Sequence, residues 1–236
     1  MFFREISYLA AQSKNTITTM WLPQGLHDTP DKLRDSLKTA VEDASKLVMR
    51  HHSNDKADYI ILGYGLCSRG VVGVRSYDIP LVVPKTDDCI GVFLGSQERY
   101  LKNFNEFSGI YWFNPGWVEN AYTPSSENFD EKRKAYMEQF EDEDTVDYLM
   151  EQEYLWVKNY NYGIYINSSI YDDEDCKNKA KKDIEGLGWE YKELSGSSQM
   201  LQSLVDGSFT DDFLIVPPYH EIAETFDEHK IKAVKY

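Results

Sequence analysis

The chain has 236 residues and a formal net charge of −15, because 40 Asp and Glu residues outnumber 25 Lys and Arg residues. A charge of this sign repels phosphate backbones and anionic headgroups, which argues against a nucleic-acid or membrane-surface binder. Aromatic residues make up 14% of the chain, far too many for a disordered protein. With no apolar run as long as the ~20 residues of a membrane span, we expect a folded cytoplasmic protein.

Strand-like apolar runs alternate with helix-like segments along the sequence. The β-branched and aromatic run at residues 17–22 predicts a first strand, and apolar spacing over residues 30–51 predicts a helix with Pro30 in its first turn. Further strands are expected at 58–62, 79–83, 110–113, 163–167, 189–194 and 213–216, and further helices at 89–104, 128–159, 173–187 and 197–205.

Continuous apolar strands that are each followed by a helix are typical of a parallel sheet covered on both faces. The sequence therefore predicts an α/β fold with three layers, a mostly parallel sheet and helices on both of its faces, with two similar lobes as one arrangement. Residues 1–125 form the predicted lobe that carries the Cys and His motifs. Residues 126–236 hold an acidic helical segment and a second α/β half, and a single domain is the alternative.

Chemically active residues follow the first four predicted strands. They are His27, Cys67, Cys89 and Glu119. Ligands of open parallel sheets bind outside the carboxyl ends of the strands. Because parallel strands end at the same edge, we expect these four side chains to converge.

The predicted chemistry of this edge is metal binding. Two thiolates from Cys67 and Cys89 with the imidazole of His27 form a soft ligand set, which suits zinc and, alternatively, iron. Three protein ligands leave a fourth position for water or substrate. Glu119 and Asp88 are the predicted catalytic residues, as a general base or as a carboxylate partner of the histidine.

The glycines before Cys67 predict close approach of a ligand to the backbone, and Tyr64 and Gly65 are the predicted cofactor-binding residues. These glycines do not follow the spacing of a nucleotide-binding fingerprint. Each candidate also has a structural interpretation: a cysteine can be a compact buried residue, and an acid in the first helical turn is favoured by the helix dipole. Cys176 follows a run of acids at a predicted helix start, and we expect it to be structural.

Six short blocks occur in order at Gly25–Pro30, Leu62–Cys67, Ile79–Pro84, Asp88–Ile90, Leu94–Tyr100 and Asn114–Trp117. Together they resemble the family catalogued as domain of unknown function 1638 (DUF1638), from about residue 21 to residue 119. Members of that family accompany corrinoid-dependent methyl-transfer systems in methanogenic archaea and anaerobic bacteria. The resemblance therefore implies a context in one-carbon metabolism and adds a corrinoid to the cofactors to be considered, but it implies no reaction.

One position departs from the family pattern. The family usually has a histidine before the Asp-Cys pair, and this chain has Asp87 there. If that histidine is a ligand in the relatives, then either Asp87 replaces it here or this chain binds its metal more weakly.

Two functions from different classes follow. In the first, the Cys/Cys/His site activates a thiol or a methyl group of a small-molecule substrate. In the second, the protein is a non-catalytic accessory that holds a metal or corrinoid or docks a methyltransferase, with the acidic segment Glu127–Glu153 as its docking face. A third hypothesis, thiol redox chemistry between Cys67 and Cys89, requires their Cα atoms to lie ~4.4–6.8 Å apart.

Overall fold

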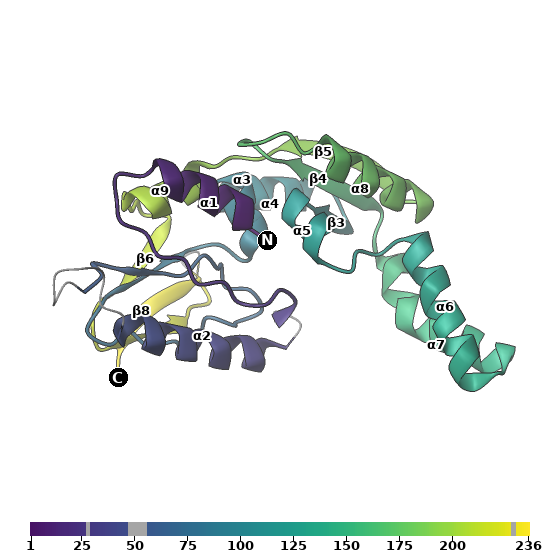
Figure 1. The fold of residues 1–236 in the computed structure, drawn as a ribbon, viewed down its shortest axis with the longest axis horizontal. Coiled ribbons are helices and arrows are strands. Elements are labelled where there is room, and N and C mark those ends of the chain that lie inside the picture. The colour runs from purple at the N-terminus through teal and green to yellow at the C-terminus, as the bar shows by residue number, and fades with distance from the viewer. Residues whose placement is uncertain (27–28, 47–55, 228–229) are drawn as a thin grey trace. The chain divides into compact units, whose positions relative to one another are not determined.

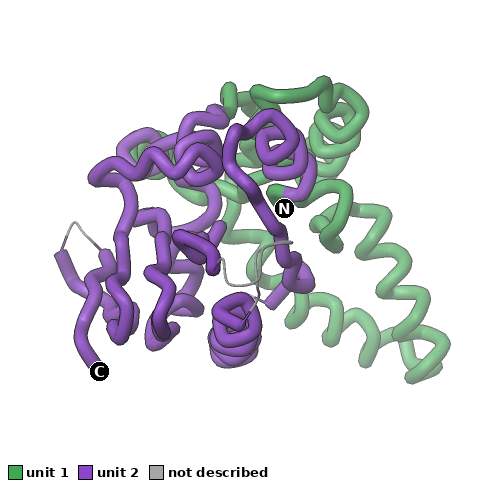
Figure 2. The backbone as a smooth tube through the Cα atoms, turned by 60° about the vertical axis from the view of Figure 1, so that its left-hand side comes forward, with its two compact units in different colours: residues 1–2, 101–196 green, residues 3–100, 197–236 purple. Residues whose placement is uncertain are grey.

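The computed structural model describes residues 1–26, 29–46, 56–227 and 230–236. The chain divides into two compact units, shown in different colours in Figure 2. Unit 1 comprises residues 1–2 and 101–196, and unit 2 comprises residues 3–100 and 197–236. The predicted boundary at residues 125–126 lies inside unit 1. Both units contain helices and strands, so the predicted α/β class is confirmed, while the three layers and the two similar lobes stay predictions.

Unit 2 contains two small sheets (Figure 1). Its elements are α1 (Phe3–Gln12), α2 (Pro30–Lys46), β1 (Ile60–Ile61), β2 (Leu81–Pro84), α3 (Cys89–Leu94), α9 (Gln199–Asp206), β6 (Phe213–Val216), β7 (His220–Glu224) and β8 (Ile231–Lys235). Strand β2 lies between β1, which is parallel to it, and β6, which is antiparallel. Strands β7 and β8 form an antiparallel pair. Helix α4 (Gln97–Glu106) crosses the boundary between the units.

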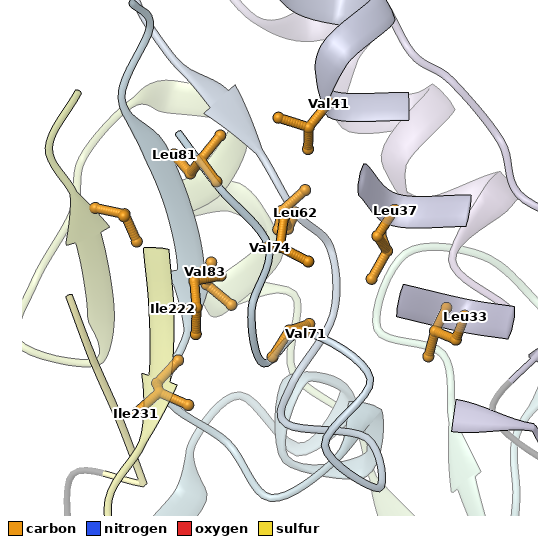
Figure 3. Close-up of a cluster of buried hydrophobic side chains, with 11 residues drawn as sticks. Leu33, Leu37, Val41, Leu62, Val71, Val74, Leu81, Val83, Ile222 and Ile231 are labelled. Atoms are coloured by element: carbon orange, nitrogen blue, oxygen red, sulfur yellow. The ribbon is translucent and has the colours of Figure 1, made fainter. Parts of the chain in front are cut away.

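The core of unit 2 lies between α2 and the strands. One face of α2 carries Leu33, Leu37 and Val41, which are each at most 2% exposed. Figure 3 shows these side chains together with buried residues of β2, β7 and β8 and of the segments that follow β1. Burying a face of this kind is what holds a helix on a sheet, since each fully buried aliphatic side chain contributes about 1.5–3 kcal/mol.

Unit 1 is built on a wholly parallel sheet of three strands in the order β3-β4-β5. Its elements are β3 (Ile110–Phe113), α5 (Pro115–Asn120), α6 (Ser126–Phe140), α7 (Glu143–Tyr154), the 3-10 helix η2 (Leu155–Asn159), β4 (Tyr162–Asn167), α8 (Glu174–Gly186) and β5 (Glu190–Ser195). Helix α8 packs closely on β4, because a side chain at Gly163 would lie 2.3 Å from Ile184 of α8.

Three expectations about strands are corrected. Residues 17–22 form no strand, although their composition favours one. Strand β3 pairs with β4, so it belongs to a different sheet from β1 and β2. Strand β6 runs antiparallel to β2, so the sheet of unit 2 is mixed. Helix α1 and strands β7 and β8 were not predicted. Within the described ranges, no helix has the length and apolar character needed to cross a bilayer.

Candidate functional site

The candidate site lies in unit 2, where the segments that follow β1 and β2 run side by side. Both strands end a few residues before it, and two further hydrogen bonds join the segments that follow them. The backbone N–H of Leu66 donates to the carbonyl of Thr86 at 2.8 Å, and that of Cys67 donates to the carbonyl of Asp87 at 3.0 Å. Two hydrogen bonds therefore hold the turn that contains Cys67 against the start of α3.

Gly65 allows this close approach. A Cβ atom at this position would lie 2.4 Å from Oγ1 of Thr86 and 2.8 Å from the carbonyl oxygen of Asp88. Such distances are far inside van der Waals contact, and the threonine hydroxyl is itself fixed by a 2.8 Å hydrogen bond to the Asp88 carbonyl. The predicted importance of Gly65 therefore has a physical basis in chain packing.

The turn after Gly65 has an unusual backbone. Cys67, Ser68 and Arg69 have φ angles of 44°, 54° and 70°, and the N–H of Gly70 donates to the carbonyl of Cys67 at 3.0 Å. Left-handed conformations cost a non-glycine residue on the order of 1–3 kcal/mol and are concentrated at functional sites. Among the described residues, this is the one place where three successive non-glycine residues have positive φ angles.

Cys89 is the first residue of α3, which begins two residues after Asp87, the hydrogen-bond partner of Cys67. Asp88 caps the helix, accepting a hydrogen bond from the N–H of Ile90 at 2.8 Å. Hydrogen bonding from the neighbouring Cys89 thiol is the main cause that lowers the pKa of Cys67. Backbone N–H groups of Cys89 and Gly65 lower it further, while burial acts in the opposite direction.

The pKa values of the two thiols therefore shift in opposite directions. The pKa of Cys89 is raised well above its ordinary value, because its thiol is the donor of the shared hydrogen bond and because it is buried. Both cysteines are free and only partly exposed. The arrangement favours one thiolate, on Cys67, held by a neutral thiol on Cys89.

Two phenols and a carboxyl group surround the sulfurs. Burial, followed by the neighbouring Cys67 and Cys89, raises the pKa of Tyr64 to about 12, so it stays a neutral donor. Burial also raises the pKa of Asp88, although hydrogen bonds from backbone N–H groups of α3 and from Tyr100 lower it. The same burial raises the pKa of Tyr100.

The carboxyl group and the backbone N–H of Asp87 all have partners. Its Oδ1 lies 3.0 Å from the ammonium of Lys230, and its Oδ2 accepts a 2.6 Å hydrogen bond from Nε2 of Gln97. Its N–H donates to Oε1 of the same glutamine at 2.9 Å. Asp87 therefore ties this loop to α4 and to the start of β8. Sequence reasoning missed Lys230, for which the sequence carries no signal, and Gln97, although Gln97 lies in one of the blocks that carry the resemblance.

The structure brings together most of the residues predicted for this site. Tyr64, Gly65, Cys67, Asp88 and Cys89 all lie at the paired ends of β1 and β2. The predicted ligand His27 lies outside the described residues. The expectation that His27 lies at this edge depended on a strand at residues 17–22, and those residues form no strand.

Glu119 lies in α5 of unit 1. Its Oε1 is 3.8 Å from the thiol sulfur of Cys176. The expectation that it shares a sheet edge with Cys67 rested on one continuous sheet and is corrected, because β3 pairs in the other sheet.

A metal ion would find two sulfur donors here. Among the described residues no group of three or more His, Cys, Asp or Glu side chains is placed to hold a metal ion. The chemistry of the pair still suits a soft ion, because a thiolate with an adjacent thiol can supply two sulfur ligands once both protons are lost. Further ligands would have to come from His27 or from a bound molecule.

The comparisons with known proteins give one match. The family model described as "Protein of unknown function (DUF1638)" matches residues 21–205. This range includes every residue of the candidate site except Lys230. No curated protein and no solved structure matches the chain.

Proposed function

We propose that this chain, which belongs to the DUF1638 family, binds zinc through Cys67, Cys89 and His27 and activates a thiol or a methyl group in one-carbon metabolism. The observation that supports the proposal most is the 3.0 Å hydrogen bond from the N–H of Cys67 to the carbonyl of Asp87, which places the Cys67 turn two residues from Cys89, where each thiol shifts the pKa of the other. Iron is the alternative ion, and a corrinoid is the alternative cofactor. The free cysteines suit the reducing cytoplasm, where we place the protein.

In this proposal, some residues of the chain hold the metal ligands and others orient the bound molecule. A bound zinc ion supplies a Lewis acid that keeps a sulfur ligand or a substrate thiol deprotonated at neutral pH. Backbone N–H groups of Gly65 and Cys89 lower the pKa of Cys67 and so favour the thiolate that a metal ion needs. Tyr64, which keeps its proton at neutral pH, can donate a hydrogen bond to a ligand beside the sulfurs. Gly65 packs against Thr86 and Asp88, and its role in binding a cofactor stays a prediction.

The two predicted catalytic acids, Asp88 and Glu119, lie in different units. Asp88 caps α3 and thereby positions Cys89, and its raised pKa would suit a proton-transfer role at the same place. Glu119 lies in unit 1, next to Cys176. The catalytic role of each stays a prediction.

Metal content tests the proposal. Protein purified without oxygen should contain about one zinc or iron ion per chain, and Cys67→Ser and Cys89→Ser should each lose it. Cys176→Ser is the matched control, because Cys176 lies in unit 1, beside Glu119, and should leave the metal content unchanged. His27→Ala should weaken binding. If folded Cys67→Ser and Cys89→Ser proteins retain the ion, or if the folded wild-type chain takes up none from added zinc, the proposal fails.

A second candidate function is an accessory role in which the pair of helices α6 and α7 docks a protein with a basic surface. Helix α6 has no buried residue, and Val146 is the buried residue of α7. Within the pair, Arg133 bonds to Asp147 and Glu143, and Lys132 bonds to Glu153. These internal ion pairs use two of the basic side chains, which leaves a strongly acidic surface for a methyltransferase partner.

Binding measurements separate the two functions. If the accessory role holds, affinity for a candidate methyltransferase should fall steeply with salt, because exposed charges are screened over ~10 Å at 0.1 M. Substituting Asp130 and Glu138, which lie on α6, by Asn and Gln should weaken that binding and leave the metal content unchanged. Affinity that does not respond to salt or to these substitutions would contradict the acidic docking face.

A further inference from the structure

Each segment that carries a predicted sulfur ligand also carries a charged residue close to its cysteine. Arg69 follows Cys67 by two residues, and Asp87 precedes Cys89 by two residues. The two segments run side by side, because the N–H of Cys67 donates to the carbonyl of Asp87 at 3.0 Å. Any contact that holds Arg69 and Asp87 therefore also limits how far the two cysteine-bearing segments can move apart.

Both charged side chains form ion pairs with the hairpin of β7 and β8. Nε of Arg69 lies 2.7 Å from Oε2 of Glu224, the last residue of β7. Nζ of Lys230, the residue before β8, lies 3.0 Å from Oδ1 of Asp87. The N–H of Thr225 donates to the carbonyl of Lys230 at 2.8 Å, which keeps this end of the hairpin closed. One end of the hairpin thus bonds to both cysteine-bearing segments.

The hairpin is itself fixed to the core of unit 2 by other contacts. The N–H of Gly73 donates to the carbonyl of Ile222 at 2.7 Å, and the N–H of Ile222 donates to the carbonyl of Val74 at 3.0 Å. Ile222 and Ile231 are 1% and 2% exposed, and both lie in the buried cluster of Figure 3. The hairpin can therefore act as a fixed support for the charged side chains that it holds.

We propose that the ion pairs of Arg69 and Asp87 with this hairpin hold the two cysteine-bearing segments at the separation that a bound metal ion requires. The side chains of Glu224 and Lys230 are only 18% and 26% exposed, so water screens these pairs less than pairs at the open surface. The inference rests on the proposed zinc site and extends it to the hairpin, which lies beyond the family match at residues 21–205. Residues that orient metal ligands without touching the metal typically change metal affinity about 10–100-fold when they are replaced.

Variants of the hairpin test the inference by titration of the full chain with Co²⁺, a spectroscopic substitute for zinc. Glu224→Gln and Lys230→Met each remove one ion pair, and each should lower the affinity for Co²⁺ by about 10–100-fold. Lys230→Arg keeps the positive charge and should restore most of that affinity. Glu221→Gln is the matched control on β7, because Glu221 pairs with Arg75 at 3.0 Å, and Lys232→Met is the control on β8, where Lys232 is exposed. Both controls should bind Co²⁺ as the wild type does.

Amide hydrogen exchange of the metal-free chain separates this inference from the proposed function. In both ion-pair variants the N–H of Cys67 should exchange faster, while the N–H of Leu62, which bonds to the carbonyl of Val82 at 2.9 Å, should keep its rate and show that the sheet is intact. Wild-type Co²⁺ affinity in both variants, or an equal loss in their controls, would overturn the inference and leave the metal site itself standing. If the wild-type chain binds no metal, the proposed function fails, and an unchanged exchange rate of Cys67 in the variants would then overturn the inference as well.

Discussion

At the scale of single residues, the site combines a strained turn with glycines that make room for it. The left-handed φ angles at Cys67, Ser68 and Arg69 are sustained by the packing that follows, because a side chain at Gly70 would lie 2.3 Å from Leu33 of α2. The strained turn is therefore held against the main core of unit 2. Strain of this kind is maintained where the surrounding structure fixes it, and here it presents a cysteine.

The first prediction concerns Gly65. Replacing it by Ala should push the turn away from Thr86 and Asp88, destabilise the chain by about 1–3 kcal/mol, and displace Cys67 enough to reduce the metal content. Gly63→Ala is the control, because a Cβ there meets nothing within 4 Å, and it should change stability by at most ~0.5 kcal/mol. Denaturant unfolding measures the stability of both variants, and elemental analysis measures their metal content. A Gly65→Ala protein with wild-type stability and wild-type metal content would contradict this account.

At the scale of elements, α2 shows how a helix becomes part of the core. Its buried residues recur at spacings of four along the sequence, so that one stripe faces the strands (Figure 3). Leu37→Ala should cost about 2–5 kcal/mol, because it removes a fully buried side chain and leaves a cavity. Lys38→Ala, at an exposed neighbour on the same helix, should stay within ~0.5 kcal/mol. Equal unfolding midpoints for the two variants would show that α2 contributes little to this core.

The same scale explains what the sequence could predict. The run that became β2 and the periodic pattern of α2 are local signals: β2 was predicted within two residues of its bounds and α2 begins at Pro30 as predicted, while the predicted end of that helix at residue 51 lies outside the described residues. Residues 17–22 carry an equally good strand composition and form none, because strand propensity depends on a partner and on burial. An apolar run also does not state the direction or the identity of its partner. Thus β6 was predicted as a strand, but its antiparallel pairing with β2 was not.

The residues predicted for the site likewise divide into those that local sequence signals identified and those that they could not identify. Cys67 and Cys89 were predicted together because each follows a short apolar run, and those two runs are neighbouring parallel strands. Glu119 was added by the same argument applied to β3, which belongs to another sheet. The contact of Asp87 with Lys230 joins residues far apart in the sequence. No local sequence pattern predicts a contact of that kind.

At the scale of the whole molecule, unit 2 is made from two separate stretches of chain. The family match ends at residue 205, whereas β6, β7 and β8 follow it and supply Val216, Ile222 and Ile231 to the core. Strand β6 is also the partner of β2 on the side away from β1. The segment beyond the family match therefore completes the sheet whose edge carries the two cysteines.

A chain that ends at Gly207 tests this dependence. It keeps the whole matched range but loses β6, β7 and β8, and each of the three lost core side chains contributes about 1.5–3 kcal/mol. Since a typical domain is stable by only about 5–15 kcal/mol, unit 2 should fail to fold, with loss of amide exchange protection in β2 and loss of bound metal. Deleting Tyr236 alone removes one hydrogen bond to Ser76 and a contact with Arg75, so it should cost only about 1–2 kcal/mol. Protection of β2 that survives the longer truncation would mean that β1, β2 and α2 form a stable core by themselves, and that the C-terminal strands only cover it.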